Sequence, residues 1–188
     1  MNFDTLYQEF QPRIQRYLSR LVGTAEAADL TQTVFLKVSR GLDDFRGESS
    51  LATWIYRIAT NTAHDHLALA QTKQQSAEKA LDEDETIDDF PADDRADSDR
   101  EYIRREMNAC VRGIAEQLPE NYRSVLLLAD LEEFTNAEIA EILGLSLDTV
   151  KIRLHRGRAA LRKALETACD FYHDEQSELR CDRKPPRK

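Results

Sequence analysis

Apolar residues recur at intervals of three and four along three stretches within about the first 70 residues, and this spacing is typical of amphipathic helices. We expect the first helix to end at Gly23, with Pro12 marking a kink or a restart. The second should begin at a Thr24 cap and end at Gly41, and the third should begin at Ser50. The expected inward-facing positions are Phe3, Leu6, Phe10, Ile14, Tyr17, Leu18 and Leu21, then Leu30, Val34 and Val38, then Leu51, Trp54, Ile55, Ile58, Thr62 and Leu69.

Helical spacing resumes at Tyr102 and continues to Leu165. Pro119 suits the first turn of one of these helices, where its missing N–H would be unpaired in any case. Two short helices close the region. Thr135 and Glu138 form a capping box, Gly144 stops the first helix, and Ser146 caps the second. Because no stretch shows the alternating pattern of a strand, we predict an all-α protein whose second domain has four helices and ends in a helix-turn-helix.

Between these two helical regions the composition changes abruptly. Residues 78–101 hold twelve acidic and three basic side chains, and the difference of nine equals the net charge of −9 of the whole chain. Carboxylates that repel one another, with few apolar residues among them, predict a flexible linker. We expect two small helical domains at 1–72 and 102–167, an acidic linker at 73–101 and a tail at 168–188.

Composition narrows the class of protein. The chain has 188 residues, 41% of them hydrophobic, and no apolar run is long enough for a membrane span or a secretory signal. Three cysteines, Cys110, Cys169 and Cys181, form no disulfide framework and suit a reducing compartment. We therefore expect a cytoplasmic protein without membrane insertion. The negative charge argues against a protein that coats DNA by electrostatics alone.

The last predicted helix is strongly basic within this acidic chain. Six Lys or Arg side chains and a single acid lie between Ser146 and Leu165. On a helical wheel one stripe packs and the opposite face is displayed. The packing stripe is Val150, Leu154, Gly157, Leu161 and Leu165, and the displayed face is Asp148, Lys151, Ile152, His155, Arg156 and Ala159. This layout suits a recognition helix in a DNA major groove. The alternative is a helical hairpin whose basic face is merely solvated.

Four motifs in order resemble those of the extracytoplasmic-function (ECF) sigma factors. They are residues 28–35 (ADLTQTVF), 45–61 (FRGESSLATWIYRIATN), 118–123 (LPENYR) and the helix-turn-helix, and the likeness covers nearly all of residues 1–167. The resemblance implies a two-domain initiation subunit without catalytic activity. Such a subunit binds bacterial core RNA polymerase and directs it to promoter DNA. We also expect an anti-sigma protein to hold it inactive.

The resemblance also assigns roles in the N-terminal domain. It implies that one helix docks on the largest polymerase subunit, that a loop takes a flipped base of the minus-10 non-template strand, and that the next helix meets the same strand. The implied residues are Asp29, Gln32 and Phe35 for polymerase, Arg46, Gly47, Glu48, Ser49 and Ser50 in the loop, and Arg57 and Asn61 in the helix. Phe35 is equally suited to core packing. Trp54 suits base stacking or, as its place on the apolar stripe favours, core packing.

In the second domain the resemblance directs the basic helix to the minus-35 element. The base-facing residues that it implies are Lys151, Ile152, His155 and Arg156, the same face that the helical wheel displays. Arg153 and Arg158 fall on the flanks, where phosphates run, and Thr149 lies at the start of the helix. Ile152 and His155 have no fixed base partner, so the promoter sequence cannot be derived.

Two parts of the chain depart from the family pattern. No Lys or Arg lies between Asp65 and Lys73, so we assign no phosphate contacts there. His64 and His66 point to different sides of a helix and therefore do not suggest a metal pair. In the tail, Cys169 and His173 share a face if the last helix continues, and Cys181 could fold back. That geometry permits a zinc site or a Cys169–Cys181 disulfide, although the spacing matches no standard finger, so we assign no cofactor. The alternative is a frayed extension.

A rival interpretation is a self-sufficient helix-turn-helix regulator that binds a palindrome as a dimer. Such a protein needs a dimerisation surface and intrinsic affinity for duplex DNA, and the acidic charge and the N-terminal motifs argue against it. An enzyme with an attached helix-turn-helix finds no support, because the chain has no phosphate-binding glycine loop and no nucleophile motif.

Overall fold

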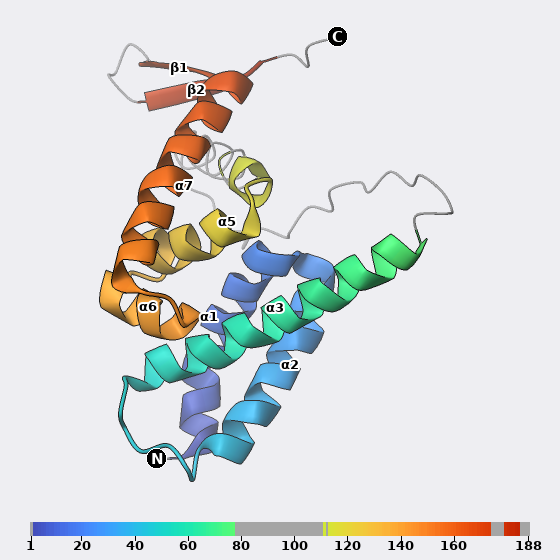
Figure 1. The fold of residues 1–188 in the computed structure, drawn as a ribbon, viewed down its shortest axis with the longest axis vertical. Helices are drawn as coiled ribbons and strands as arrows, with labels where there is room; N and C mark the ends of the chain where they lie inside the picture. The colour runs from blue at the N-terminus through green and yellow to red at the C-terminus, as the bar shows by residue number, and fades with distance from the viewer. Residues whose placement is uncertain (1, 78–110, 112, 174–178, 185–188) are drawn as a thin grey trace, which may run out of the picture.

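The computed structural model describes residues 2–77, 111, 113–173 and 179–184. In chain order these contain the helices α1 (Phe3–Val22), α2 (Thr24–Gly41), α3 (Leu51–Ala77) and α5 (Glu120–Leu126), the π-helix η1 (Leu127–Leu131), the helices α6 (Asn136–Leu143) and α7 (Leu147–Ala168), and the strands β1 (Cys169–His173) and β2 (Leu179–Arg183). The helical fold class is confirmed, and the two strands are an addition to it. Figure 1 shows α1 to α3 in one bundle, α5 to α7 beside it, and the strands at the far end of α7.

The N-terminal bundle forms because each helix has one apolar face. In α1 the buried residues are Leu6, Phe10, Ile14, Tyr17, Leu18 and Leu21, as the spacing predicts, while Phe3, also expected to face inward, is only partly buried. The helix continues through Pro12, so the expected restart is wrong. Proline has no N–H to donate to the carbonyl of Gln8, four residues earlier. Gln8 and Pro12 are both exposed, so this carbonyl is open to solvent.

The helix ends of this bundle differ in two places from the sequence expectation. Gly23, with φ of 102°, occupies the N-cap of α2 in place of Thr24, and this conformation is one that glycine adopts without a steric penalty. α3 begins at Leu51, one residue after the expected start, and Ser50 caps it, since Ser50 Oγ accepts a hydrogen bond from the Thr53 backbone N–H at 3.0 Å. α3 then runs to Ala77, past the expected domain boundary at residue 72. The acidic stretch 78–101 lies outside the described residues.

The helix-turn-helix is built as its sequence indicates. Thr135 Oγ1 accepts from the Glu138 backbone N–H at 3.3 Å, and the Glu138 carboxylate accepts from the Thr135 N–H at 2.9 Å, which completes the capping box. Gly144 ends α6 in the left-handed conformation with φ of 62°, and Ser146 caps α7. The buried face of α7 consists of Val150, Leu154 and Gly157, so the helical wheel is confirmed.

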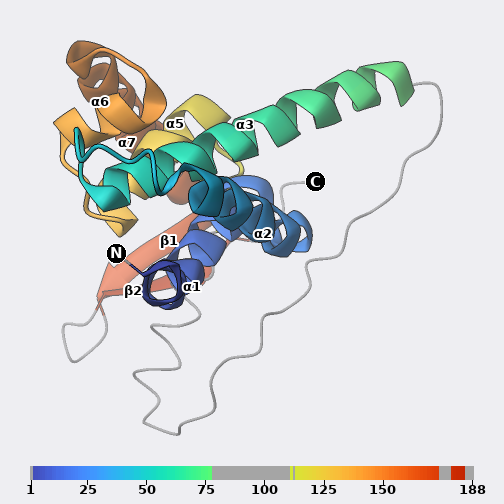
Figure 2. The same ribbon diagram turned by 90° about the horizontal axis from the view of Figure 1, so that it is seen from below.

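The two halves of the chain share one hydrophobic core. The buried cluster runs without a break from Leu6 in α1 through Ala63 in α3 to Leu154 in α7. α6 packs on α3, and Figure 2 shows this contact from below, with α6 beside the N-terminal part of α3. In this structure the two domains therefore lie against each other and do not stand apart.

The tail forms a β-hairpin where the sequence suggested a helix or a frayed end. β1 and β2 pair antiparallel, with Phe171 opposite Cys181 and Cys169 opposite Arg183. Lys184 closes the hairpin: its N–H donates to the Ala168 carbonyl at 2.8 Å, and its Nζ lies 3.1 Å from Asp170 Oδ1. The aromatic residues of β1 favour a strand, but β1 is only five residues long. Such a short strand directly follows a long helical pattern, and the sequence analysis therefore did not predict it.

Candidate nucleic-acid and polymerase interfaces

A loop between α2 and α3 presents the residues assigned to the minus-10 strand. Arg46, Gly47 and Glu48 are exposed, and Gly47 adopts φ of 73°. The loop is supported from beneath by Trp54, whose ring lies 5.1 Å from that of Phe45 and packs beside Gly41. Trp54 is thus packed against the core, as its place on the apolar stripe favoured.

The two serines of this loop differ in what their hydroxyls can do. Ser50 Oγ caps α3 and also lies 2.7 Å from Thr53 Oγ1, so its hydrogen-bonding capacity is largely used within the protein. Ser49 has no such role in the helix cap. Ser49 is only partly exposed, whereas Ser50 is exposed.

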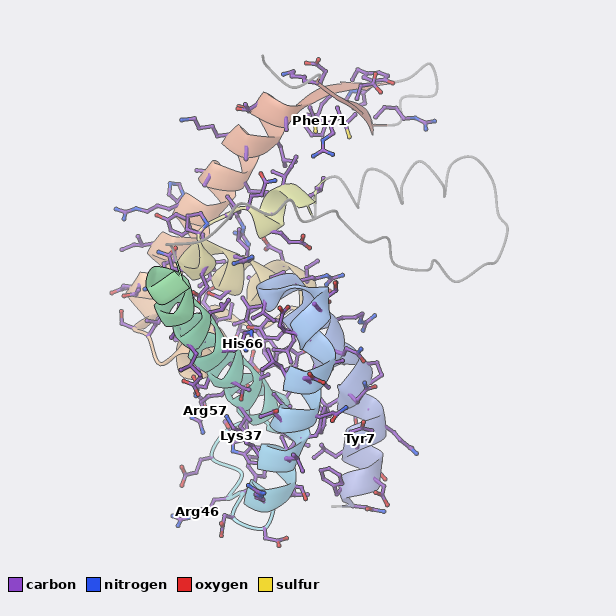
Figure 3. The ribbon with its side chains drawn as sticks, turned by 90° about the vertical axis from the view of Figure 1, so that its right-hand side faces the viewer. Tyr7, Lys37, Arg46, Arg57, His66 and Phe171 are labelled. Atoms are coloured by element: carbon purple, nitrogen blue, oxygen red, sulfur yellow. The ribbon has the colours of Figure 1, made fainter. Side chains whose placement is uncertain are left out.

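Cations and an amide continue this surface along α3. Arg57 is partly exposed, and Asn61 is exposed one turn later. Lys37 of α2 joins them, because its Nζ donates to Thr62 Oγ1 at 2.9 Å and so holds a positive charge beside α3. Figure 3 shows Arg46 on the loop, with Lys37 and Arg57 further along the same part of the molecule. Sequence reasoning missed Lys37, because its link to α3 depends on how α2 and α3 pack.

The surface of α2 assigned to polymerase needs one correction. Asp29 and Gln32 are exposed, but Phe35 is only 3% exposed and meets the ring of Tyr7 edge-on at 4.8 Å. Phe35 therefore packs in the core and does not present a contact. Its neighbour Leu36 is 59% exposed, one helical turn from Gln32. A large exposed apolar side chain beside polar ones is the signal that could have identified Leu36.

The displayed face of α7 is the one that the wheel selected. Lys151, Ile152, His155 and Arg156 are exposed, while Thr149 and Arg153 are partly exposed. An open groove runs along this helix and is lined by Asn136, Lys151, Leu154, His155, Arg158, Ala159 and Arg162. Its cationic walls, beside the start of α6, suit the phosphate backbone of DNA.

Arg158 has a partner that the sequence did not indicate. Its guanidinium lies 2.5 Å from Asp130 Oδ1 and also donates to Oδ2 at 3.4 Å. The hydrogen bond and the charge of Asp130 raise the pKa of Arg158 above its already high ordinary value. In this structure Arg158 therefore ties α7 to η1, and a phosphate contact requires it to leave Asp130.

The tail residues considered for metal or redox chemistry are not gathered into a site. The register places Cys169, His173 and Cys181 on one face of the hairpin, yet Cys181 is paired with Phe171 and lies diagonal to Cys169. No disulfide joins these two thiols, and Cys169 is buried. In the described part of the chain no group of three or more His, Cys, Asp or Glu side chains could hold a metal ion. His64 does not pair with His66 either, since its Nε2 lies 3.0 Å from Glu120 Oε1.

Of the helices that the structure describes, none has both the length and the apolar character required to span a bilayer.

Comparison with known proteins bears on both halves of the chain. Residues 6–72 match the family model Sigma-70 region 2, and residues 108–161 match Sigma-70, region 4. The chain is 35% identical over 166 residues to the RNA polymerase sigma-H factor of Pseudomonas aeruginosa, which covers 87% of this chain and 86% of that protein. It is 31% identical over 160 residues to the ECF RNA polymerase sigma-E factor of Escherichia coli K12, which covers 85% and 84% respectively.

Solved structures show the same fold. The sigma factor RpoE of Bartonella quintana, solved in complex with the anti-sigma factor NepR, superposes with a TM-score of 0.69 at 21% identity and covers 87% of this chain and 96% of that one. CnrH, solved in complex with the cytosolic domain of CnrY, superposes with a TM-score of 0.61 at 22% identity and covers 88% of each chain.

Proposed function

We propose a division of roles between the two halves of this chain, which belongs to the extracytoplasmic-function (ECF) sigma factors of bacterial RNA polymerase. As a sigma factor it directs core polymerase to promoters, and it is not an enzyme. The N-terminal half, residues 1–72, engages polymerase and the minus-10 strand. The C-terminal half, residues 102–167, reads the minus-35 element, and residues 73–101 connect the two.

The exposed cationic face of α7 is the observation that supports the C-terminal role most strongly. Lys151 and Arg156 project from a helix whose opposite side is fixed by buried contacts, inside a chain with a net charge of −9. Lys or Arg opposite guanine is the commonest specific contact in a major groove. We assign Lys151, Ile152, His155 and Arg156 to bases, Arg153 to phosphate, and Thr149 to the start of the interface. Arg158 joins them only after it releases Asp130.

The N-terminal role rests on a polar loop that stands clear of the core. Arg46, Gly47, Glu48 and Ser49 take the flipped base, while Ser50 fixes the start of α3. Arg57, Asn61 and Lys37 follow the single strand, whose phosphates the two cations attract. Asp29, Gln32 and Leu36 make the polymerase contact on α2.

We propose further that an anti-sigma protein regulates this chain in the cytoplasm. One protein with the same fold was solved with an anti-sigma factor, and a second was solved with the cytosolic domain of another protein, CnrY. An inhibitor of this kind would cover charged surfaces on both halves at once.

Transcription from genomic DNA with core polymerase tests these roles. With the wild-type chain present, new transcript 5′ ends should share sequence elements about 10 and 35 base pairs upstream. Arg156→Ala should relax the upstream element and Arg46→Ala should reduce strand opening, while Thr5→Ala, at an exposed site on α1, should do neither. If no new 5′ ends arise although the chain co-purifies with core polymerase, the division of roles is wrong.

A further inference from the structure

Ile152 is a large apolar side chain at the most prominent position of the recognition helix α7. It follows Val150 by two residues and precedes Leu154 by two, which places it about 160° around the helix from each of them. Val150 is 0% exposed and Leu154 is 5% exposed, so these two contacts fix the rotation of α7. Ile152 itself is 49% exposed. The packing of α7 therefore directs Ile152 away from the core.

Cationic side chains lie on either side of Ile152 on the displayed face of α7. Lys151 precedes it and Arg156 follows one turn later, and both are exposed. Their charges attract DNA phosphates and base edges, and so hold this face against the duplex. Ile152 belongs to the second turn of the helix, and the N-terminal residues of a recognition helix are the ones that reach base edges. Binding in this orientation buries Ile152 against a base pair.

Two other side chains near the start of α7 are less suited to an apolar contact with a base. Thr149 Oγ1 lies 2.8 Å from Ser146 Oγ, and the Thr149 N–H donates to the same oxygen at 3.2 Å, so this threonine is committed to the helix cap. Leu147 is 41% exposed, but it lies five residues before Ile152 and about 140° away around the helix. On α7, which the structure describes in full, Ile152 is thus the exposed large apolar residue of the displayed face.

An isoleucine has one favourable partner on the edges of the four bases in a major groove. Thymine displays its C5-methyl group there, whereas guanine, adenine and cytosine display hydrogen-bonding groups that an isoleucine cannot satisfy. Covering such a group removes its water without replacing the hydrogen bond, which costs free energy. Contact with a methyl group removes apolar surface from water on both sides. The side chain of Ile152 therefore favours thymine and disfavours the other three bases.

We propose that Ile152 contacts the C5-methyl group of a thymine in the minus-35 element and makes that base pair a determinant of promoter choice. The inference rests on the proposed function of α7 and adds the kind of base that one residue selects. Residues four apart on a helix have Cβ atoms about 5–6 Å apart, and base pairs stack about 3.4 Å apart. The thymine should therefore lie within about two base pairs of the pair that Arg156 contacts.

Uracil differs from thymine only by the absence of this methyl group, so it isolates the contact. Holoenzyme is assembled from core polymerase and the full chain, as wild type, Ile152→Ala or Leu147→Ala. In a promoter that wild-type holoenzyme uses, each thymine of the minus-35 element, on either strand, is replaced in turn by uracil. Competition in fluorescence anisotropy measures the affinity for each duplex.

Leu147→Ala is the matched control, because it also removes an exposed apolar side chain from α7. Alanine is the best helix former, so both variants should fold, and circular dichroism checks this.

With wild type and Leu147→Ala, uracil at one position should weaken binding about fourfold, as expected for one buried methyl group. With Ile152→Ala the same replacement should have no effect. A minus-35 element at which no uracil weakens binding, or a uracil effect that persists in Ile152→Ala, would overturn the thymine contact.

These outcomes are separate from a failure of the proposed function. Wild-type holoenzyme that requires the minus-35 element but responds to no thymine methyl group removes only this inference. Wild-type holoenzyme whose binding does not depend on the minus-35 element at all removes the proposed function of α7, and the thymine contact with it.

Discussion

Gly157 sets the distance between the recognition helix and its support, and substitution there has a calculable effect. A Cβ at this position would lie 3.3 Å from Leu126 Cγ, Leu126 Cδ1 and Tyr122 Cβ, which is closer than the optimal carbon separation of about 3.5–4.0 Å. Gly157→Ala gains about 1 kcal/mol of helix propensity, and the crowding offsets it, so we expect little net change. Gly157→Val gains only a few tenths of a kcal/mol in propensity and overpacks the contact by about 1–3 kcal/mol.

Thermal unfolding followed by circular dichroism measures this difference. Gly157→Val should lower the Tm by about 2–12 °C, given about 2–4 °C for each kcal/mol in a chain of this size. Ala159→Val is the control, because residue 159 is exposed on the same helix and carries the β-branched penalty without the crowding. Equal losses in the two valine variants, or no loss at Gly157, would refute the reasoning that α7 is held in close contact with α5.

Three further predictions follow from the site and the core. Arg156→Ala should cost about 1–3 kcal/mol in binding at the minus-35 element and relax sequence choice, whereas Arg158→Ala should weaken all sequences alike; equal loss of discrimination in binding assays would mean that α7 is rotated. Phe35→Ala should cost about 3–5 kcal/mol of stability, while Leu36→Ala should leave the Tm unchanged and weaken capture of core polymerase, and the reverse pattern would restore Phe35 as the contact. Burial raises the pKa of Tyr17 and Tyr56, so both stay neutral in the folded chain at pH values where they ionise in the unfolded chain. The free energy of unfolding should therefore be unaffected by these tyrosines below about pH 10 and should fall above it by about 1.4 kcal/mol per pH unit for each one. Denaturant melts between pH 9 and 11 measure this slope, which Tyr56→Phe should halve and which a flat profile would contradict.

Local patterns in the sequence were sufficient to predict the helix-turn-helix. Thr135, Glu138, Gly144 and Ser146 act on backbone groups within four residues of themselves, so their spacing alone determines where α6 and α7 begin and end. The displayed face of α7 follows from the same helical period. The family motifs are also continuous stretches of sequence, and they located the loop at Arg46 and the helix at Asp29.

Contacts between distant segments could not be predicted in this way. The Tyr56 hydroxyl donates a hydrogen bond to Glu132, 76 residues away, and neither residue type signals a partner across that distance. The link between Arg158 and Asp130 depends on how α7 lies on η1, and η1 itself is a π-helix that no apolar period announces. Phe35 was ambiguous because a helical wheel does not show where α1 places Tyr7.

Affinity for an identified promoter duplex, measured by fluorescence anisotropy at physiological salt with and without core polymerase, tests the central claim most directly. The free chain should bind weakly, because it offers few phosphate contacts and carries a net charge of −9. With core polymerase present, binding should reach the nanomolar range and depend on both promoter elements. Nanomolar binding by the free chain, as independent regulators achieve, would contradict its role as a sigma factor.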